Sequence, residues 1–216
     1  MTEIKICGIT NIEDAIFATE NGADALGFIF HPASPRCITP QLARQIIRIL
    51  SRKVARVGVF VNSDVREVMW TADYCGLDFI QLHGDETQDY CRHFPASRLI
   101  KVVFPMEETD VDNLRLYPVK AILADSRDTG RQGGTGKATN WSAAKKISEM
   151  MPLVLAGGLH IGNIEEAIKT VLPSAVDVCS GVEARPGKKD PEKVKNIIEI
   201  VRLLKINEGM KIFGET

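Results

Sequence analysis

Hydrophobic and polar positions repeat along this chain in a two-part pattern. A short run of β-branched and apolar residues is followed by a polar or glycine-rich turn, and then by a segment with apolar residues at helical spacing. The runs are apolar nearly throughout, which is typical of parallel strands covered by helices. Eight strands are predicted, at residues 4–9, 25–30, 56–61, 78–83, 99–103, 120–125, 152–157 and 175–180.

Helix-start and helix-end signals lie between these runs. The predicted N-cap residues are Thr10 or Asn11, Thr39, Ser63 or Asp64, Asn163 and Asp190. Proline follows two of them, at Pro40 and Pro191, where the first helical turn tolerates it. The first helix is predicted to end at Asn21–Gly22 and the third at Gly76. Helical patterns after the fourth, fifth and sixth strands are shorter.

The strand–helix alternation predicts an α/β protein with a parallel sheet. Eight such units fill residues 1–216 without a linker, so we expect a single domain. A closed (β/α)8 TIM barrel is favoured over an open doubly wound sheet, because the first turn reads CGITN and lacks the G-x-G-x-x-G pattern. The length lies near the lower end of the ~200–400 residues usual for such barrels.

Charge and cysteine content narrow the class of protein. The net charge of -1, with mixed signs, argues against nucleic-acid or anionic-membrane binding. The N-terminus lacks a signal-like apolar stretch, and runs such as PLVLAGGL are shorter than the ~18 residues of a membrane span. Five scattered cysteines without a C-x-x-C pair argue against disulfides and structural zinc. These features predict a cytoplasmic protein.

Candidate chemistry lies where the predicted strands end, since barrels place their active sites at the carboxyl ends of the strands. Cys7 shares a strand face with Lys5, and Asp125 shares one with Leu123. We therefore expect Cys7 and Asp125 to face the barrel mouth from strands that are not neighbours, across a bound ligand. The other polar candidates at these ends are Arg36, Asn62, Gln81 and His83.

Two glycine-bearing turns follow the last two strands, at residues 156–159 and 179–183. Glycine lets backbone N–H groups approach an anion, so the pair predicts a phosphate site, although βα turns favour glycine in any case. A third glycine-rich segment, residues 128–141, resembles a P-loop but has Arg131 and Ala138 where that motif needs glycine and Ser or Thr. We interpret it as a loop able to close over a ligand, with a disordered surface loop as the alternative.

Several motifs together resemble the phosphoribosylanthranilate isomerase family of tryptophan biosynthesis. They are KICGIT, GFIFHPASPR, VGVFVN, QLHGDE, LADS followed by GGTGKATNW, LAGGL and DVCSGVEARPGKKD, and they span the whole chain in order. The resemblance implies a cofactor-free Amadori rearrangement of N-(5'-phosphoribosyl)anthranilate to 1-(2-carboxyphenylamino)-1-deoxyribulose 5-phosphate. It also implies a small-molecule substrate and a monomer or homodimer.

The resemblance further assigns roles to residues. Cys7 would be the general base and Asp125 the general acid. Arg36 would hold the anthranilate end, and Asp177 would meet a ribose hydroxyl. The remaining implied contacts are Gln81, His83 and Gly134 with the substrate, and Gly157, Gly158, Ser180 and Gly181 with the phosphate. A thiol of ordinary pKa, about 8.5, would be partly ionised near neutral pH, whereas Asp125 would have to start protonated in a desolvated site.

Three alternatives remain open from the residues. Another phosphosugar isomerase on this barrel that uses two aspartates would need an aspartate in place of Cys7. A metal-dependent epimerase would need paired histidines at strand ends, and only His83 qualifies. A non-catalytic barrel would leave Cys7 as a buried structural residue, which is the usual state of a free cysteine.

Overall fold

Eight parallel strands close into a barrel in the computed structural model, which describes residues 1–106, 109–128, 131–132, 139–204 and 211–214. The order around the barrel is β1-β10-β9-β6-β5-β4-β3-β2. The strands are β1 (Glu3–Cys7), β2 (Ala25–Ile29), β3 (Ala55–Phe60), β4 (Phe79–Leu82), β5 (Leu99–Val103), β6 (Ala121–Ala124), β9 (Leu153–Leu155) and β10 (Ala175–Val178). The predicted (β/α)8 barrel is confirmed.

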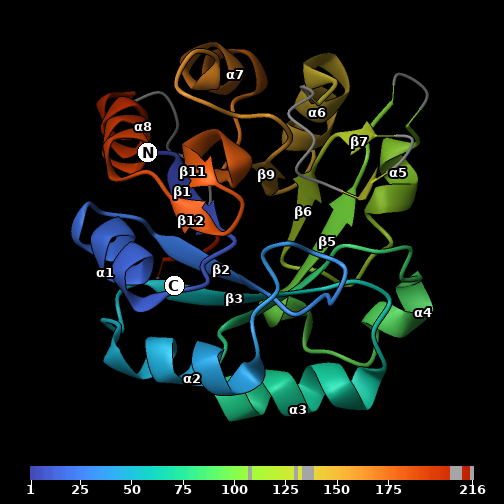
Figure 1. Cartoon of the computed structure of the whole chain (residues 1–216). Helices are drawn as coiled ribbons and strands as arrows, with labels where there is room; N and C mark the ends of the chain where they lie inside the picture. Colours follow the sequence, from blue (N-terminus) through green and yellow to red (C-terminus); the bar gives the residue numbers. More distant parts are fainter. Residues whose placement is uncertain (107–108, 129–130, 133–138, 205–210, 215–216) are drawn as a thin grey trace.

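Helices surround this barrel as a ring (Figure 1). They are α1 (Ile12–Glu20), α2 (Pro40–Ile49), α3 (Val65–Cys75), α4 (Gln88–Cys91), α5 (Val111–Leu114), α6 (Trp141–Ser148), α7 (Ile164–Val171) and α8 (Pro191–Leu203), with short 3-10 turns η1 (Ala96–Arg98) and η2 (Ser180–Val182). The helices after the fourth and fifth strands are single turns, in agreement with their weaker sequence patterns. No helix of the described residues is both long enough and apolar enough to cross a membrane.

Most predicted helix caps are confirmed. The side chains of Asn11, Thr39, Asp64 and Asp190 each accept a hydrogen bond from a backbone N–H of the first turn. Asn163 holds the N-cap position of α7, but its side chain makes no capping bond. Its amide instead accepts from the His160 N–H and donates to the Gly158 carbonyl, so it braces the preceding loop rather than the helix.

Strand alternation divides the apolar residues into two layers. Ile4, Ile6 and Ile122 belong to the outer layer between barrel and helices, as their parity predicts. Leu123 belongs to the inner layer, which fills the barrel interior and also includes Val57 and Val154. Residues of the same parity as Leu123 therefore point toward the barrel axis, and the last of them on each strand lie at its mouth.

Two antiparallel hairpins within the loops were not predicted. One pairs β7 (Arg127–Asp128) with β8 (Arg131–Gln132), and the other pairs β11 (Glu183–Arg185) with β12 (Lys188–Lys189). The first lies in the glycine-rich segment 128–141 that was interpreted as a closing loop. Residues 129–130 and 133–138 of that segment are outside the described residues.

The C-terminal segment closes the opposite, amino end of the barrel. Ile212 and Phe213 are buried in the interior layer, and the Phe213 ring packs edge-on against Phe79 with centroids 5.7 Å apart. The Glu3 carboxylate accepts hydrogen bonds from the backbone N–H groups of Ile212, Phe213 and Gly214 at 2.6–3.0 Å. The first strand and the last described residues are thereby tied together by charge-assisted hydrogen bonds.

Replacing Phe213 by alanine tests this closure. We expect Phe213→Ala to lower the free energy of unfolding by about 3 kcal/mol, because a buried aromatic ring is removed from the barrel interior. Urea denaturation measures the change, and Leu203→Ala, at a side chain that is 79% exposed, is the matched control with little effect. An equal free energy of unfolding in the two variants would show that the Phe213 ring does not stabilise the barrel.

Candidate active site

Cys7 ends strand β1 and points into the barrel mouth. It is 5% exposed. Gly8 follows it with a φ of 77°, and a Cβ there would lie 2.9 Å from Cδ of Arg36. A Cβ at Gly27 on the neighbouring strand would lie 2.6 Å from the Cys7 sulfur. Glycine at both positions leaves room for the thiol and for the side chain above it.

A buried ion pair lies directly beneath Cys7. Lys5 Nζ is 2.9 Å from Asp177 Oδ2, and the two residues face each other in the β1–β10 register. Burial by itself would lower the pKa of Lys5, but the charge of Asp177 and contact with the Cys7 thiol outweigh it and raise that pKa above its usual value. Lys5 is therefore a fixed cation next to the thiol.

Cys179 lies beside Cys7, directly after the neighbouring strand β10. The register pairs Ile6 with Val178, so the next residue on each strand is a cysteine. The hydrogen bond with Cys179, followed by burial, raises the pKa of the Cys7 thiol well above its usual range. The same hydrogen bond, together with the charges of Lys189 and Arg36, outweighs burial and lowers the pKa of Cys179 to about 7. The sequence did not indicate what sets the charge state of Cys7, and the structure shows that Lys5, Asp177 and Cys179 influence it.

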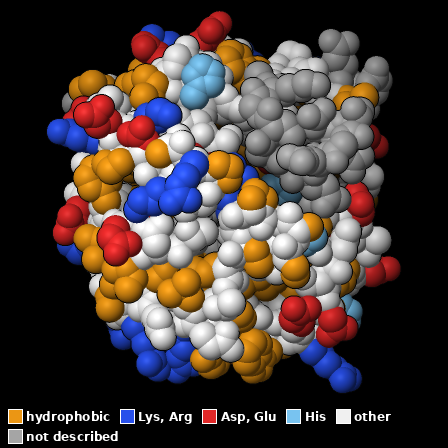
Figure 2. Space-filling view, in the orientation of Figure 1, with side chains coloured by type: hydrophobic (Ala, Val, Ile, Leu, Met, Phe, Trp, Pro, Cys, Tyr) orange, Lys and Arg blue, Asp and Glu red, His pale blue; other side chains and the backbone are white. Residues whose placement is uncertain are grey.

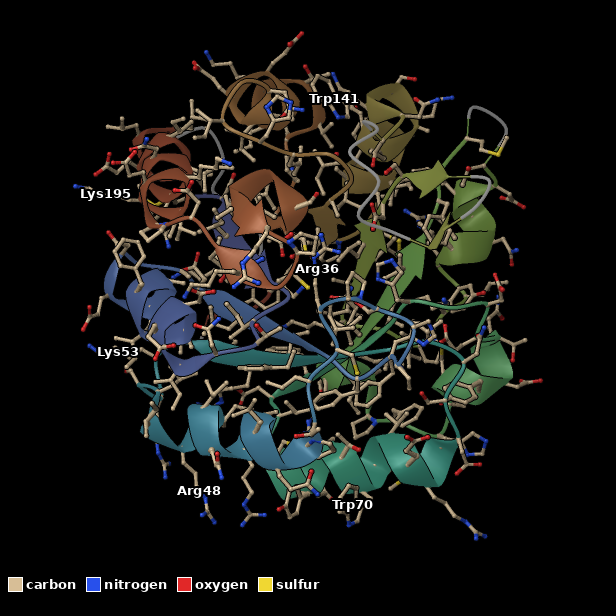
Figure 3. All side chains as sticks on the ribbon, in the orientation of Figure 1. Arg36, Arg48, Lys53, Trp70, Trp141 and Lys195 are labelled. Carbon is tan, nitrogen blue, oxygen red and sulfur yellow. The ribbon has the colours of Figure 1, made fainter. Side chains whose placement is uncertain are left out.

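Arg36 lies over the middle of the mouth, between the loop after β2 and the β11–β12 hairpin (Figure 3). Its Nε and Nη2 atoms donate to the two carboxylate oxygens of Glu183 at 2.8 and 2.7 Å. Lys189 Nζ approaches the same carboxylate at 3.2 Å. Burial would raise the pKa of Glu183, but the hydrogen bonds from Arg36 and the charge of Lys189 lower it. The hairpin thus holds the arginine in place by a bidentate ion pair.

Asp125 follows β6 on the other side of the mouth, together with His83 and Gln81. The Gln81 amide donates to His83 Nδ1 at 3.1 Å, so the proton of a neutral ring is on Nε2. His83 Nε2 lies 3.3 Å from Asp125 Oδ2, without the alignment of a hydrogen bond. Asp125 Oδ1 accepts from the Ser126 N–H at 2.7 Å, which orients the carboxyl group.

The two predicted phosphate turns lie side by side. Gly157 and Gly158 have φ values of 84° and 64°, which favour glycine, and a Cβ on Gly157 would overlap the Thr139 hydroxyl and lie 3.0 Å from Asp125 Oδ1. A Cβ on Gly181 would overlap the carbonyl oxygen of Leu159. Only glycine permits this close packing of the turns after β9 and β10.

An open groove of about 420 Å³ runs beside the mouth. Loops after β1, β2 and β10 line it, and Arg185 and Lys188 supply basic side chains from the β11–β12 hairpin. In the space-filling view, Lys and Arg side chains on this side of the face are interspersed with Asp and Glu side chains (Figure 2). Glu13 also lines the groove, and Lys188 is paired with Asp14 at 2.6 Å, so the charge of the lining is mixed.

The structure brings most of the predicted site residues to one end of the barrel. Those placed there are Cys7, Arg36, Gln81, His83, Asp125, Gly157, Gly158, Asp177, Ser180 and Gly181. Gly134 lies outside the described residues. The prediction missed the contributions of Lys5, Cys179, Glu183 and Lys189. The register of the first and last strands was a signal for Cys179, since a closed barrel makes them neighbours.

A metal centre has no geometric support in the described ranges. No group of three or more His, Cys, Asp or Glu side chains is placed there to hold an ion. The arrangement that is present consists of a thiol pair and a carboxyl group on opposite sides of a mouth bordered by glycine turns. It provides acid–base groups together with backbone donors for an anion.

The family model for N-(5'-phosphoribosyl)anthranilate (PRA) isomerase matches residues 4–200. The chain belongs to this family. The PRA isomerase of Syntrophus aciditrophicus is 52% identical over 202 residues, which cover 94% of this chain and 88% of that protein. The isomerase of Thermotoga neapolitana is 45% identical over 201 residues, 92% of this chain and 98% of that protein.

Solved PRA isomerase structures have the same fold. The Thermotoga maritima isomerase superimposes with a TM-score of 0.86 at 43% identity, and the match covers 94% of this chain and 100% of that chain. Another PRA isomerase structure, in complex with reduced 1-(o-carboxyphenylamino)-1-deoxyribulose 5-phosphate, matches with a TM-score of 0.82 at 42% identity over 94% of this chain and 100% of that one. The predicted resemblance, barrel and aldose–ketose isomerase class are confirmed.

Removing Lys5 tests the ion pair beneath the thiol. We expect Lys5→Met to lower the free energy of unfolding by about 3–5 kcal/mol, because the Asp177 carboxylate would be buried without its partner. The double variant Lys5→Met/Asp177→Asn should recover part of this loss, since no unpaired charge remains. Chemical denaturation measures both. Lys169→Met, at an exposed pair on α7, is the control, with a change within about 0.5 kcal/mol.

Proposed function

We propose that Cys7 and Asp125 carry the acid–base steps by which this PRA isomerase converts N-(5'-phosphoribosyl)anthranilate to 1-(2-carboxyphenylamino)-1-deoxyribulose 5-phosphate. One observation carries the proposal. The Cys7 thiol, at the end of β1, and the Asp125 carboxyl group, directly after β6, both face the barrel interior at the same mouth. Strands β10 and β9 lie between them in the barrel. A substrate bound between them would have one group on each side.

The carboxyl group suits the first step. Opening the ribose ring requires a proton on the ring oxygen while the anilino nitrogen supplies electrons to form a Schiff base. Asp125 would donate that proton. It is 7% exposed, and its orientation is held by the Ser126 N–H through Oδ1, which leaves Oδ2 on the side of His83. A positioned acid of this kind typically contributes about 10²–10⁴-fold to the rate.

The thiol suits the second step. The iminium of the Schiff base acidifies the C2' proton, and Cys7 as thiolate would remove it to give an enolamine that tautomerises to the ketone. Lys5 lies next to the sulfur inside the barrel and favours its anionic form. The ion pair with Asp177 holds the Lys5 ammonium in place while Cys7 gains and loses its proton.

Two unpartnered acceptor atoms fit the sugar. Gln81 Oε1 and Asp177 Oδ1 are buried, and neither has a hydrogen-bond partner within the described part of the chain. Buried acceptors of this kind require donors, and ribose hydroxyl groups supply them. Their positions beside Lys5 and His83 would set the sugar between the thiol and the carboxyl group.

The anionic ends of the substrate fit the two sides of the mouth. Arg36 gives two of its five N–H donors to Glu183, which leaves three for the anthranilate carboxylate. The backbone N–H groups at Gly157, Gly158, Ser180 and Gly181 would hold the phosphate, as barrels commonly do after their last two strands. The PRA isomerase complex noted above holds a ligand with the same two anionic groups.

Several further expectations from the sequence stay predictions. They are the single domain over residues 1–216, the substrate contact of Gly134, the absence of a cofactor, the cytoplasmic location and the monomeric or homodimeric state. Sedimentation of the purified protein measures the last of these.

Turnover can be measured directly, by generating the substrate from anthranilate in the cuvette and following the loss of its fluorescence. No rate above background would refute the activity.

Substitution of the proposed acid and base gives the sharpest test of their roles. We expect Cys7→Ser and Asp125→Asn each to lower kcat by more than tenfold, about 10²–10⁴-fold for a lost acid or base, with little change in unfolding free energy. The same fluorescence assay measures kcat, and Cys91→Ser on α4, remote from the mouth, is the control. Full turnover by Cys7→Ser would show that another group is the base.

The phosphate turns are tested by a like charge. Ser180→Asp should raise KM for the substrate by at least tenfold, since a carboxylate in the turn after β10 would repel the phosphate. Its kcat should change less, because Cys7 and Asp125 are untouched. Ser180→Ala is the matched control without the charge. An unchanged KM in Ser180→Asp would place the phosphate elsewhere.

A further inference from the structure

The mouth contains a second thiol that the reaction steps above do not use. Cys179 follows β10 as Cys7 ends β1, and the preceding residues Ile6 and Val178 are register partners, so the two cysteines lie side by side at the mouth. Both thiols are free. We infer that Cys179 is the proton partner of Cys7, so that the two thiols hold one negative charge between them and act as a single base.

Charged groups surround the pair from every element that packs against it. On the side of Cys7, the Lys5 ammonium favours an anion and the Asp177 carboxylate disfavours it. On the side of Cys179, the Lys189 and Arg36 cations favour an anion and Glu183 disfavours it. Cations therefore flank the pair at both ends, and the site stabilises one negative charge on either sulfur.

Burial limits the pair to a single charge. Cys7 is 5% exposed and Cys179 is partly buried, so two adjacent thiolates would repel each other in a poorly solvated site. One thiolate with one thiol is stable, because the S–H group donates to the anion. Groups coupled in this way lose their protons in two separate steps that belong to the pair.

The first of these steps lies near neutral pH. The pKa of Cys179 is lowered to about 7 by its hydrogen bond with Cys7 and by Lys189 and Arg36, while the pKa of Cys7 is raised. These opposite directions favour the negative charge on Cys179 and the proton on Cys7 in the resting pair.

Catalysis then requires one proton shift within the pair. The S–H proton of Cys7 moves to the Cys179 thiolate, which leaves a thiolate on Cys7 and a thiol on Cys179 with no change in net charge. Cys7 next takes the C2' proton of the substrate, and both sulfurs are then protonated. One proton leaves to the product or to solvent, and the pair returns to its resting state. This cycle rests on the proposed role of Cys7 as the base.

Cys179 is thus a positioning residue whose loss should move a pH profile. Without it, Cys7 loses the partner that shares its charge, and it ionises alone at a higher pH. We expect the acid limb of kcat/KM in Cys179→Ser and Cys179→Ala to move upward by about one pH unit or more relative to the wild-type protein. Activity at neutral pH then falls about tenfold per unit of displacement and recovers at higher pH.

Thiolate absorbance in the ultraviolet provides a readout that does not depend on turnover. Burial raises the pKa of Cys75 and of Cys91 to about 11 and also raises that of Cys37, so only the pair should ionise near neutral pH. The wild-type protein and Cys75→Ser, the matched control on α3, should show one thiolate with a midpoint near 7. In Cys179→Ser, this ionisation should move to higher pH.

The outcomes separate this inference from the proposed function. A wild-type pH profile and wild-type thiolate titration in folded Cys179→Ser would overturn the inference and leave Cys7 as a base acting alone. Full activity in Cys7→Ser would overturn the base assignment itself, whatever Cys179 does. Circular dichroism of each variant confirms the fold, and Cys179→Ser keeps a hydroxyl donor in case the alanine variant is unstable.

Discussion

The ion pair between Lys5 and Asp177 inside the barrel is the interaction on which the site depends. A buried charge is costly unless it is paired, and these two strands place a cation and an anion face to face at 2.9 Å. The pair links β1 to β10 directly below the two thiols. It thereby fixes the register that brings Cys7 and Cys179 together, and it supplies the local positive charge that a thiolate needs.

The upper side of the mouth is arranged around a second ionic group. Glu183 on β11 accepts two hydrogen bonds from Arg36 and forms an ion pair with Lys189. This group is partly buried and joins the loop after β2 to the hairpin after β10. The same residues that orient Arg36 for an anion also set the charge around Cys179. In the proposed reaction, the Glu183 carboxylate would therefore link the recognition of the substrate by Arg36 to the ionisation of the base.

Close backbone packing governs the remaining side of the mouth. The turns after β9 and β10 touch where Gly181 meets the Leu159 carbonyl, and Gly157 lies against the Asp125 carboxyl group. A side chain at either glycine would separate these segments. The same contacts thus position the proposed acid, Asp125, and the proposed phosphate donors of the two turns. The distance between these groups is therefore fixed, and they would meet the ribose ring oxygen and the phosphate of the substrate.

The sequence by itself determined the barrel, since alternating apolar strands and helical segments have only a few parallel arrangements, and strand parity placed Cys7 and Asp125 at its mouth. Local rules also predicted caps such as Asn11 and Asp190. Only the tertiary structure decided that Lys5 pairs with Asp177, that Glu183 holds Arg36, and that Cys179 lies beside Cys7. These contacts join residues about 150 to 170 positions apart, and their strength depends on burial and on the charges nearby, which no local sequence pattern contains.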